Sequence, residues 1–301
     1  MKTGFVGIIG RPNVGKSTLL NAILGEKIAI TTEKPQTTRN AIRGIYTHYS
    51  DDELPEDLQM IFIDTPGIHR PRTKLGSYMT DAAIGTLKEV DAIIFIVDDK
   101  LSDGPGDKYI VDLLDDVVTP KILVINKIDK MQPDEFAEIY KEYEDLGLFE
   151  EIIGVSAKEG THVENVIKEV AQFMEEGPMY FPDDMITEHP ERFVVSEIIR
   201  EKILMYLQDE VPHGVAVEIE QYKEEEEEKI TKIHAVIYCE KKSHKGMIIG
   251  KGGRKLKGIG KSAREEIEVL LGTKVYLELW VKVKENWRDS DVALSNFGYK
   301  E

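Results

Sequence analysis

The residues with the clearest chemistry lie near the N-terminus, where residues 10–17 match the pattern G-x-x-x-x-G-K-[ST]. The pattern follows a short apolar run and precedes a helix-compatible stretch, which is the context that a phosphate-binding loop requires. Glycines let backbone N–H groups point at phosphate oxygens, and the helix start adds its positive dipole. We expect Lys16 to reach the β- and γ-phosphates and Ser17 to bind Mg²⁺. The predicted phosphate-binding residues are Gly10, Arg11, Pro12, Asn13, Val14, Gly15, Lys16, Ser17 and Thr18.

A second pattern, N-K-x-D at residues 126–129, indicates which base is bound. Guanine presents two donors side by side, its N1–H and its 2-amino group, and the carboxylate of Asp129 can accept both. Adenine lacks the 2-amino group, and such sites can reject the analogue by roughly 10⁴–10⁵. Asn126 and Lys127 are expected to brace the loop, with the lysine stem along the base. Farther along the chain, Ser156, Ala157 and Lys158 follow another strand, and their backbone can donate to the guanine O6.

Two polar loops predict a metal ion and a γ-phosphate sensor. Asp64 ends an apolar run and begins D-x-x-G, so its carboxylate would hold Mg²⁺ through water and the Gly67 N–H would meet the γ-phosphate. In the loop at residues 36–39, Thr38 is expected to complete the metal shell, and Thr37 is the alternative. Both loops would order on triphosphate and relax after hydrolysis. The predicted metal ligands are Ser17, Thr38 and Asp64, and the groups expected to act in hydrolysis are Lys16, Asn13, Thr38 and Gly67.

The elements that must position these residues are continuous apolar strands alternating with helical stretches. Such a pattern predicts an α/β fold with a mostly parallel, doubly wound sheet, whose ligands lie at the carboxyl ends of the strands. Residues 41–49 should pair with residues 58–63 as an antiparallel edge hairpin. The other expected strands are 5–9, 92–97, 121–125 and 152–155, and expected helices include 17–24 and 133–146.

The second half differs from the first in charge. The chain has 301 residues and a formal net charge of −17. Residues 190–301 contain 20 Lys/Arg and 21 Asp/Glu, so they carry only −1 of that charge. Within them, residues 241–264 contain nine Lys/Arg and no acidic residue. The acidic run 224–228 lies upstream, and we expect it at a solvated hairpin tip. The asymmetry predicts two domains with different ligands.

The basic stretch contains G-x-x-G at residues 250–253, with apolar residues before it and a helical pattern after it. A loop without side-chain bulk lets a nucleic-acid backbone approach, while lysines neutralise phosphates and apolar surface receives unstacked bases. The order helix–strand–strand–helix–helix–strand resembles a type II KH domain, an α+β fold. The predicted RNA-binding residues are Lys245, Met247, Ile248, Ile249, Gly250, Lys251, Gly252, Gly253, Arg254 and Lys257.

Composition and length limit the classes of protein. Hydrophobic residues make up 41% and charged residues 32%, which excludes a fully disordered chain. A single cysteine, Cys239, excludes a disulfide scaffold and fits a reducing compartment, where we expect it to be a buried small apolar residue. The absence of a long apolar run or signal-peptide layout predicts an intracellular, cytoplasmic protein. We expect a nucleotide domain at 1–176, a linker at 177–189 and an RNA-binding domain at 190–301 with a C-terminal extension. In that extension Trp287, Arg288, Phe297 and Tyr299 either add stacking surface or cap the core.

The first half resembles the TRAFAC-class GTPases in all five signatures, and the two halves together resemble the Era family of small-subunit ribosome assembly GTPases. The resemblance implies slow, Mg²⁺-dependent GTP hydrolysis, binding of the 3′ end of 16S ribosomal RNA, and a role in maturation of the 30S subunit. It also implies a possible potassium ion near Asn13 and a weak peripheral association with the inner membrane, and we expect a monomer. One departure is Ile68, because many relatives place a water-orienting Gln there and an aliphatic side chain cannot hold a water.

Two alternatives remain open at this point. The chain could be an ATP-dependent P-loop enzyme such as a small-molecule kinase, which the N-K-x-D pattern opposes. It could instead be a nucleotide-gated scaffold whose KH-like domain binds protein. Competition between ATP and GTP decides the first alternative, and the salt dependence of RNA binding decides the second.

Overall fold

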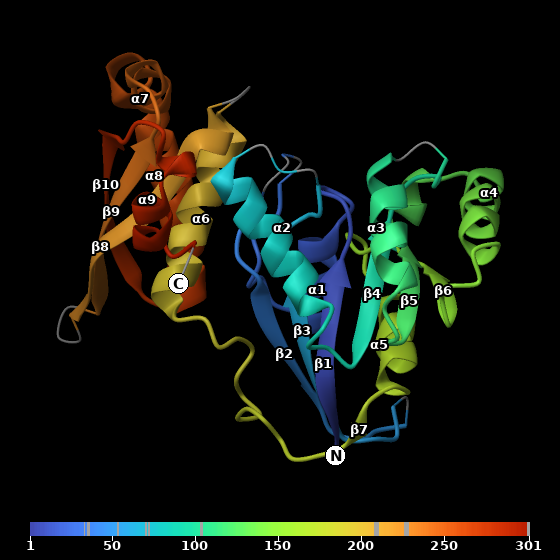
Figure 1. Cartoon of the computed structure of the whole chain (residues 1–301). Coiled ribbons are helices and arrows are strands. Elements are labelled where there is room, and N and C mark those ends of the chain that lie inside the picture. Colours follow the sequence, from blue (N-terminus) through green and yellow to red (C-terminus); the bar gives the residue numbers. More distant parts are fainter. Residues whose placement is uncertain are drawn as a thin grey trace. The chain divides into compact units, whose positions relative to one another are not determined.

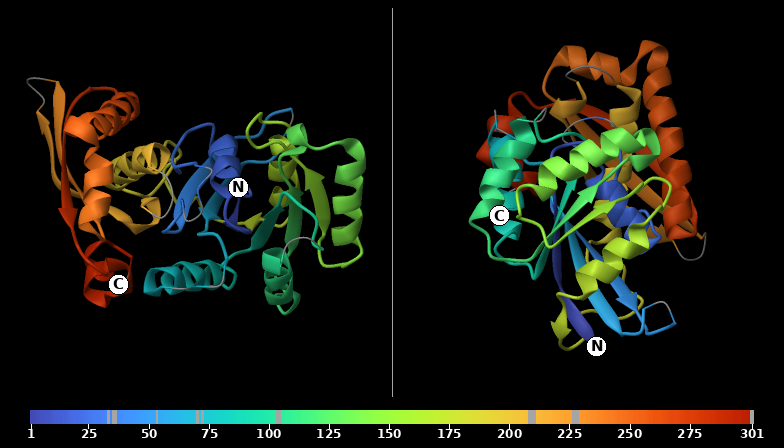
Figure 2. Two further views of the ribbon diagram at one scale, coloured as in Figure 1. Left: turned by 90° about the horizontal axis from the view of Figure 1, so that it is seen from above. Right: turned by 90° about the vertical axis from the view of Figure 1, so that its right-hand side faces the viewer.

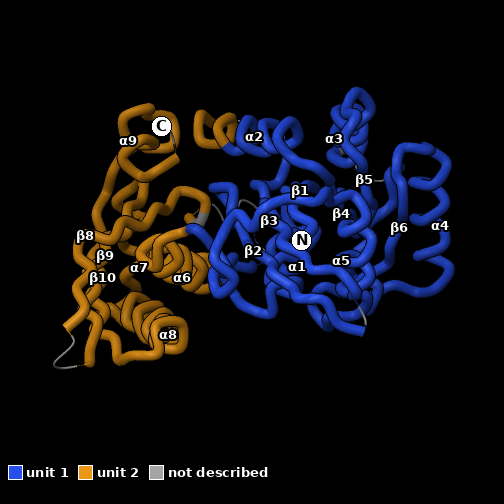
Figure 3. Tube along the Cα trace, turned by 90° about the horizontal axis from the view of Figure 1, so that it is seen from below, with its two compact units in different colours: residues 1–71, 79–188 blue, residues 72–78, 189–301 orange. Residues whose placement is uncertain are grey.

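The computed structural model describes residues 1–32, 34, 37–52, 54–69, 71, 73–102, 105–207, 211–225 and 229–299. Gln36 in the first polar loop and residues 226–228 of the acidic run lie outside these ranges. The chain divides into two compact units, shown in Figure 3. Unit 1 comprises residues 1–71 and 79–188, and unit 2 comprises residues 72–78 and 189–301.

Unit 1 is built on a seven-stranded sheet with the order β2-β3-β1-β4-β5-β6, and β7 pairs with β1 (Figure 1). Strands β3, β1, β4, β5 and β6 run parallel, whereas β2 is antiparallel to β3. The predicted parallel sheet with one antiparallel edge is therefore confirmed. The strands are β1 (Lys2–Ile9), β2 (Ile42–His48), β3 (Leu58–Asp64), β4 (Ala92–Val97), β5 (Lys121–Ile125), β6 (Glu151–Gly154) and β7 (Glu175–Glu176).

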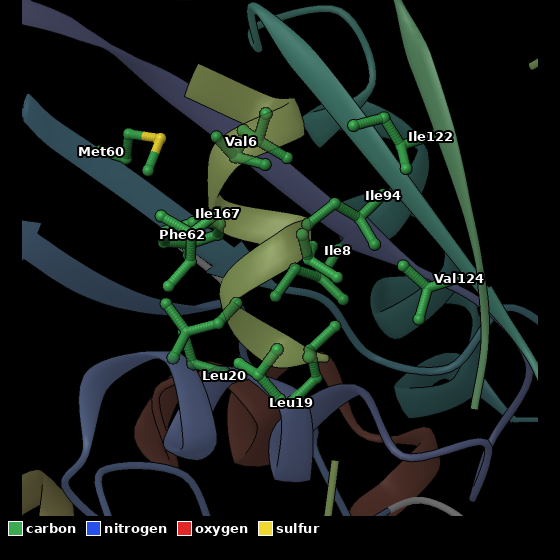
Figure 4. Packing of buried hydrophobic residues seen from close by; sticks show 14 of the residues in the cluster. Val6, Ile8, Leu19, Leu20, Met60, Phe62, Ile94, Ile122, Val124 and Ile167 are labelled. Atoms are coloured by element: carbon green, nitrogen blue, oxygen red, sulfur yellow. The ribbon is translucent and has the colours of Figure 1, made fainter. Parts of the chain in front are cut away.

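Helices lie on both faces of this sheet, as Figures 1 and 2 show. Alternate residues of β4 enter different cores, with Ile94 in one and Phe95 in the other. Burial on both faces explains why these strands are continuous apolar runs. Figure 4 shows the first core, where Leu19, Leu20 and Ile167 pack against strand residues. The helices are α1 (Lys16–Leu24), α2 (Lys74–Thr86), α3 (Pro105–Asp115), α4 (Pro133–Glu144) and α5 (Val163–Ala171).

The segment expected to be a linker runs along unit 1 before unit 2 begins at residue 189. The Gln59 side chain donates to the Phe181 carbonyl (2.8 Å) and accepts from the Tyr180 N–H (2.7 Å). Closer to unit 2, the Thr187 hydroxyl donates to the Arg43 carbonyl (2.7 Å), beside the edge strand β2. These bonds fix the segment to the sheet of unit 1.

Unit 2 has the predicted order of elements around its own core. Its sheet has the order β10-β9-β8, with β10 parallel and β8 antiparallel to β9. Strand β8 ends at Glu225, so Glu224 and Glu225 of the acidic run belong to a strand and not to the expected hairpin tip. The elements are α6 (Glu191–Tyr206), β8 (Val215–Glu225), β9 (Ile230–Cys239), α7 (Lys242–Ile249), α8 (Arg254–Leu271), β10 (Lys274–Val283) and α9 (Asp291–Asn296).

The C-terminal aromatic residues cap the core of unit 2. Trp287 is fully buried, and its indole N–H donates to the Gly214 carbonyl (2.9 Å). Its ring contacts those of Phe297 and Tyr299, and Tyr299 is itself buried. The extension was expected either to add stacking surface or to cap the core, and burial of Trp287 and Tyr299 favours capping. Cys239 is also buried, as expected.

Candidate nucleotide site and nucleic-acid interface

A cavity of about 390 Å³ opens in unit 1, next to the carboxyl ends of β1 and β5. It brings together residues of the phosphate-binding loop, both polar loops and the N-K-x-D loop. The fold thus gathers patterns that lie more than 100 residues apart in the sequence. The lining residues are Pro12, Asn13, Gly15, Lys16, Ser17, Thr18, Ile30, Thr31, Thr32, Thr37, Thr38, Gly67, Asn126, Lys127, Asp129, Lys130 and Lys158.

The phosphate-binding loop has the curled backbone that its glycines predict. Gly15 has φ 109°, and a Cβ there would lie 2.1 Å from Nδ2 of Asn126. Only glycine fits this conformation and this approach without displacing the side chain. The buried Lys16 Nζ lies 2.7 Å from the Arg11 carbonyl and 3.2 Å from the Gly10 carbonyl. Burial lowers the pKa of Lys16 to about 8, which the nearby Asp64 carboxylate opposes.

The three predicted metal ligands meet at one point. The Ser17 hydroxyl donates to Oδ2 of Asp64 (2.6 Å) and lies 2.8 Å from the Thr38 hydroxyl. Burial raises the pKa of Asp64 to about 6, although Lys16 partly offsets this. The other oxygen of Asp64, Oδ1, is buried with no hydrogen-bond partner in the described part of the chain. An orphaned carboxylate oxygen beside two hydroxyls is a donor set that fits Mg²⁺.

Thr38 and Thr37 have different surroundings. The Thr38 hydroxyl lies 3.4 Å from Oδ2 of Asp64, inside the group of predicted metal ligands. The Thr37 hydroxyl instead contacts the Thr32 hydroxyl and donates to the Lys34 carbonyl (2.6 Å). This arrangement favours Thr38 as the metal ligand.

The D-x-x-G loop approaches the phosphate-binding loop closely. A Cβ on Gly67 would lie 2.6 Å from the Pro12 nitrogen, so a side chain cannot be accommodated there. The next residue, Ile68, is buried in the core and its N–H donates to the Gly10 carbonyl (3.1 Å). Its aliphatic side chain does not line the cavity and has no polar group that could hold a water.

The N-K-x-D loop braces the site, as expected. Asn126 Nδ2 donates to the Val14 carbonyl (2.7 Å), and Asn126 Oδ1 accepts from the Ala157 N–H (3.0 Å). The exposed Asp129 accepts from the Ser156 hydroxyl (2.6 Å), which lowers its pKa. An ionised carboxylate at the cavity wall is the acceptor that a guanine edge requires.

The cavity includes four residues that the sequence motifs did not predict: Ile30, Thr31, Thr32 and Lys130. The first three follow α1, where Asn21 accepts from the N–H groups of Ile28 and Ala29. Asn21 was the sequence feature that could have pointed to this loop, because Asn side chains readily hydrogen-bond to nearby backbone groups. Conversely, the predicted residues Gly10, Arg11, Val14, Asp64, Ser156 and Ala157 do not line the cavity.

In unit 2, the G-x-x-G loop joins α7 to α8 through three glycines with positive φ: Gly250 (71°), Gly252 (60°) and Gly253 (73°). A Cβ on Gly250 would lie 2.7 Å from Cβ of Lys255, whereas Gly252 and Gly253 face open space. The loop therefore presents bare backbone to solvent. Of the predicted RNA-binding residues, Met247, Lys251, Arg254 and Lys257 are exposed, Lys245 and Ile249 are half-buried, and Ile248 is fully buried in the core.

Comparison with known proteins identifies both units. A family described as 50S ribosome-binding GTPase matches residues 5–127, and the KH domain family matches residues 210–288. A crystal structure of Era in complex with MgGDPNP and nucleotides 1506–1542 of 16S ribosomal RNA covers 100% of both chains, with a TM-score of 0.93 and 39% identity. A structure of an Aquifex aeolicus Era variant bound to GDP·AlF4⁻ aligns with a TM-score of 0.92 and 39% identity over 100% of both chains.

Curated relatives match along the whole chain. GTPase Era of Alkaliphilus oremlandii is 61% identical over 298 residues, which is 99% of each chain. GTPase Era of Clostridioides difficile is 56% identical over 301 residues, which is 100% of this chain and 99% of the relative. The chain therefore belongs to the Era family of GTP-hydrolysing P-loop enzymes with a C-terminal KH domain.

Proposed function

We propose that this chain is a GTP-controlled RNA-binding switch that binds the 3′ end of 16S ribosomal RNA during maturation of the 30S subunit. The observation that carries the proposal is the full-length similarity to the Era structure with MgGDPNP and a 16S fragment. The arrangement within each unit supports it, because a cavity with a guanine acceptor lies in one unit and a bare, basic G-x-x-G loop in the other.

In the nucleotide unit, the chain's own groups bind and orient the triphosphate. Lys16 would leave the Gly10 and Arg11 carbonyls for phosphate oxygens, and the Gly67 N–H would donate to the γ-phosphate. Ser17, Thr38 and Asp64 would hold Mg²⁺, which supplies positive charge beside the phosphates. Because Ile68 is buried, no side chain at that position orients the attacking water, and slow unassisted hydrolysis is expected.

In the KH unit, the exposed cations Lys251, Arg254 and Lys257 would neutralise RNA phosphates around the glycine loop. The exposed Met247 would offer apolar surface to an unstacked base, while the buried Ile248 would hold α7 in place from the core. The predicted ligand is single-stranded, because only unstacked bases can lie against an exposed apolar side chain such as that of Met247.

Several finer parts of the proposal rest on the family resemblance. They are a potassium ion near Asn13, a cytoplasmic location with weak association to the inner membrane, and a monomeric state. In the described ranges, no helix is both long and apolar enough to cross a bilayer. Hydrolysis rates in KCl against NaCl test the cation, vesicle flotation tests the membrane association, and light scattering tests the monomer.

The proposal is tested by fluorescence anisotropy with a labelled oligonucleotide of the 16S 3′ end over a series of salt concentrations. Contacts to several phosphates predict that log K falls linearly with log salt. Binding that is absent, or that does not depend on salt, would favour the protein-scaffold alternative. In parallel, ATP should fail to displace bound labelled GDP, whereas GTP should displace it, and displacement by ATP would favour a kinase-like enzyme.

A further inference from the structure

Asp98 lies beside the nucleotide cavity but belongs to none of the sequence motifs. It directly follows β4, and its side chain is 20% exposed. Its two carboxylate oxygens contact different loops. Oδ1 lies 3.2 Å from Nη2 of Arg11 in the phosphate-binding loop, and Oδ2 contacts Nζ of Lys127 in the N-K-x-D loop. One carboxylate therefore joins the two loops that hold opposite ends of the nucleotide.

The contacts of Asp98 with Arg11 and Lys127 form a bridge between the two loops. At its Lys127 end, a second contact reaches the phosphate-binding loop. Nζ of Lys127 donates to the Asn13 carbonyl (2.9 Å) as well as to Asp98. Lys127 has φ 67°, so its backbone is held in the left-handed region while its side chain lines the cavity. A long, flexible side chain is thus fixed at its tip, which places its aliphatic stem for contact with the base.

The Arg11 end of the bridge is anchored in the interior. Nε of Arg11 lies 2.7 Å from Oδ2 of Asp107, whose side chain is fully buried in the first turn of α3. The Arg11 carbonyl accepts from Lys16, the residue expected to reach the phosphates. Partial burial makes such charged contacts stronger than ion pairs at the open surface.

We propose that Asp98 is a positioning residue that joins the phosphate-binding loop to the base-binding loop, so that both hold a guanine nucleotide as one preorganised unit. The inference builds on the nucleotide site proposed above. Without the bridge, Lys127 keeps its contact with the Asn13 carbonyl but loses the one with Asp98. More of its side-chain freedom is then lost when the nucleotide binds, which raises the entropic cost of binding. The two partners of Asp98 are Arg11 and Lys127, and not Thr38 or Gly67, which are expected to respond to the γ-phosphate. Loss of the bridge should therefore weaken GDP and GTP binding to a similar extent.

The test is the Asp98→Asn variant, which keeps the shape of the side chain and removes its charge. Fluorescent GDP should dissociate about tenfold faster than from the wild type, the scale of one charged hydrogen bond. The KM for GTP should rise by a similar factor, and kcat should change less than KM, because the bridge reaches Lys16 and Asn13 only through the backbone carbonyls of Arg11 and Asn13. The matched control is Asp99→Asn, because Asp99 is an exposed neighbour that accepts a hydrogen bond from the adjacent Lys100 N–H. The control should release GDP at the wild-type rate.

A double-mutant cycle separates positioning from a general loss of stability. If Asp98 acts through Lys127, the variant Asp98→Asn/Lys127→Met should release GDP no faster than Lys127→Met. Additive effects of the two changes, or unchanged GDP release with a lower melting temperature, would overturn the proposal. If Asp98→Asn does not fold, Arg11→Gln tests the same bridge by removing the other partner of Asp98. Failure of the wild type to bind any guanine nucleotide would instead refute the nucleotide site itself.

Discussion

At the scale of single residues, we expect base selection to depend on Asp129. Its carboxylate is ionised, held by the Ser156 hydroxyl, and exposed at the cavity wall. In Asp129→Asn, the amide N–H₂ replaces an acceptor by a donor, which suits the 2-oxo group of xanthine rather than the 2-amino group of guanine. We expect GTP affinity to fall by two orders of magnitude or more and XTP affinity to rise, within the roughly 10⁴–10⁵ range of such discrimination.

Competition of XTP and GTP against labelled nucleotide measures this exchange. Both nucleotides carry the same triphosphate, so each serves as the control for an intact phosphate-binding loop. A variant that still prefers GTP would show that the base is read elsewhere in the cavity.

Residues that act through a local motif could be predicted from the sequence, and residues that act through the fold could not. Ser17 lies in the first turn of α1, Thr38 in the loop before β2 and Asp64 at the end of β3, and the three side chains meet. Ile30 and Lys130 line the same cavity, yet no spacing rule places them there. The position of Asp98 could not be predicted for the same reason, since its two partners lie 87 and 29 residues away along the chain.

At the scale of elements, the α7–loop–α8 unit makes a separate prediction. Gly252 has φ 60°, a conformation that Asp tolerates better than most residues, and a Cβ there meets no atom within 4 Å. The double change Lys251→Asp/Gly252→Asp should therefore leave the fold intact while placing two carboxylates against the RNA backbone. RNA affinity should fall by about 10² or more at moderate salt, with GTP affinity unchanged.

The chain offers a matched control at the other end of α8. Gly272 has φ 62° with open space around it, and Lys274 is exposed nearby, so Gly272→Asp/Lys274→Asp adds the same charges in the same backbone conformation. This control should bind RNA nearly as well as the wild type. Equal losses in both variants would indicate a general charge effect, and loss of GTP binding as well would indicate misfolding.

Elements with strong hydrophobic patterns were predictable to within a few residues. The buried strands β4 and β5 match their expected bounds, 92–97 and 121–125. By contrast, β7 is only two residues long and exists because Thr3 and Lys2 offer a partner edge. Its polar sequence, Glu175–Glu176, has no strand pattern, since pairing and not burial defines it.

At the scale of the whole molecule, the presence of two binding units raises the question of coupling. If GTP and RNA bind to a common conformation, each must raise the affinity for the other by the same factor, because linkage between binding free energies is reciprocal. Thr38 and Gly67 both line the nucleotide cavity, so the γ-phosphate can bias the loops that carry them. Typical couplings are about 1–3 kcal/mol, which corresponds to roughly 5–150-fold in affinity.

We therefore expect a 16S 3′-end oligonucleotide to bind more tightly to the full chain with a non-hydrolysable GTP analogue than with GDP, at fixed salt. By reciprocity, RNA must raise the affinity for the analogue, relative to the affinity for GDP, by the same factor. Nucleotide affinities measured with and without RNA therefore provide an independent check. Thr38→Ala, which removes a predicted metal ligand in unit 1, should shrink the ratio while leaving RNA affinity in GDP unchanged. Equal RNA affinities in both nucleotide states would mean that the KH unit is a constitutive tether, and that another partner reads the nucleotide.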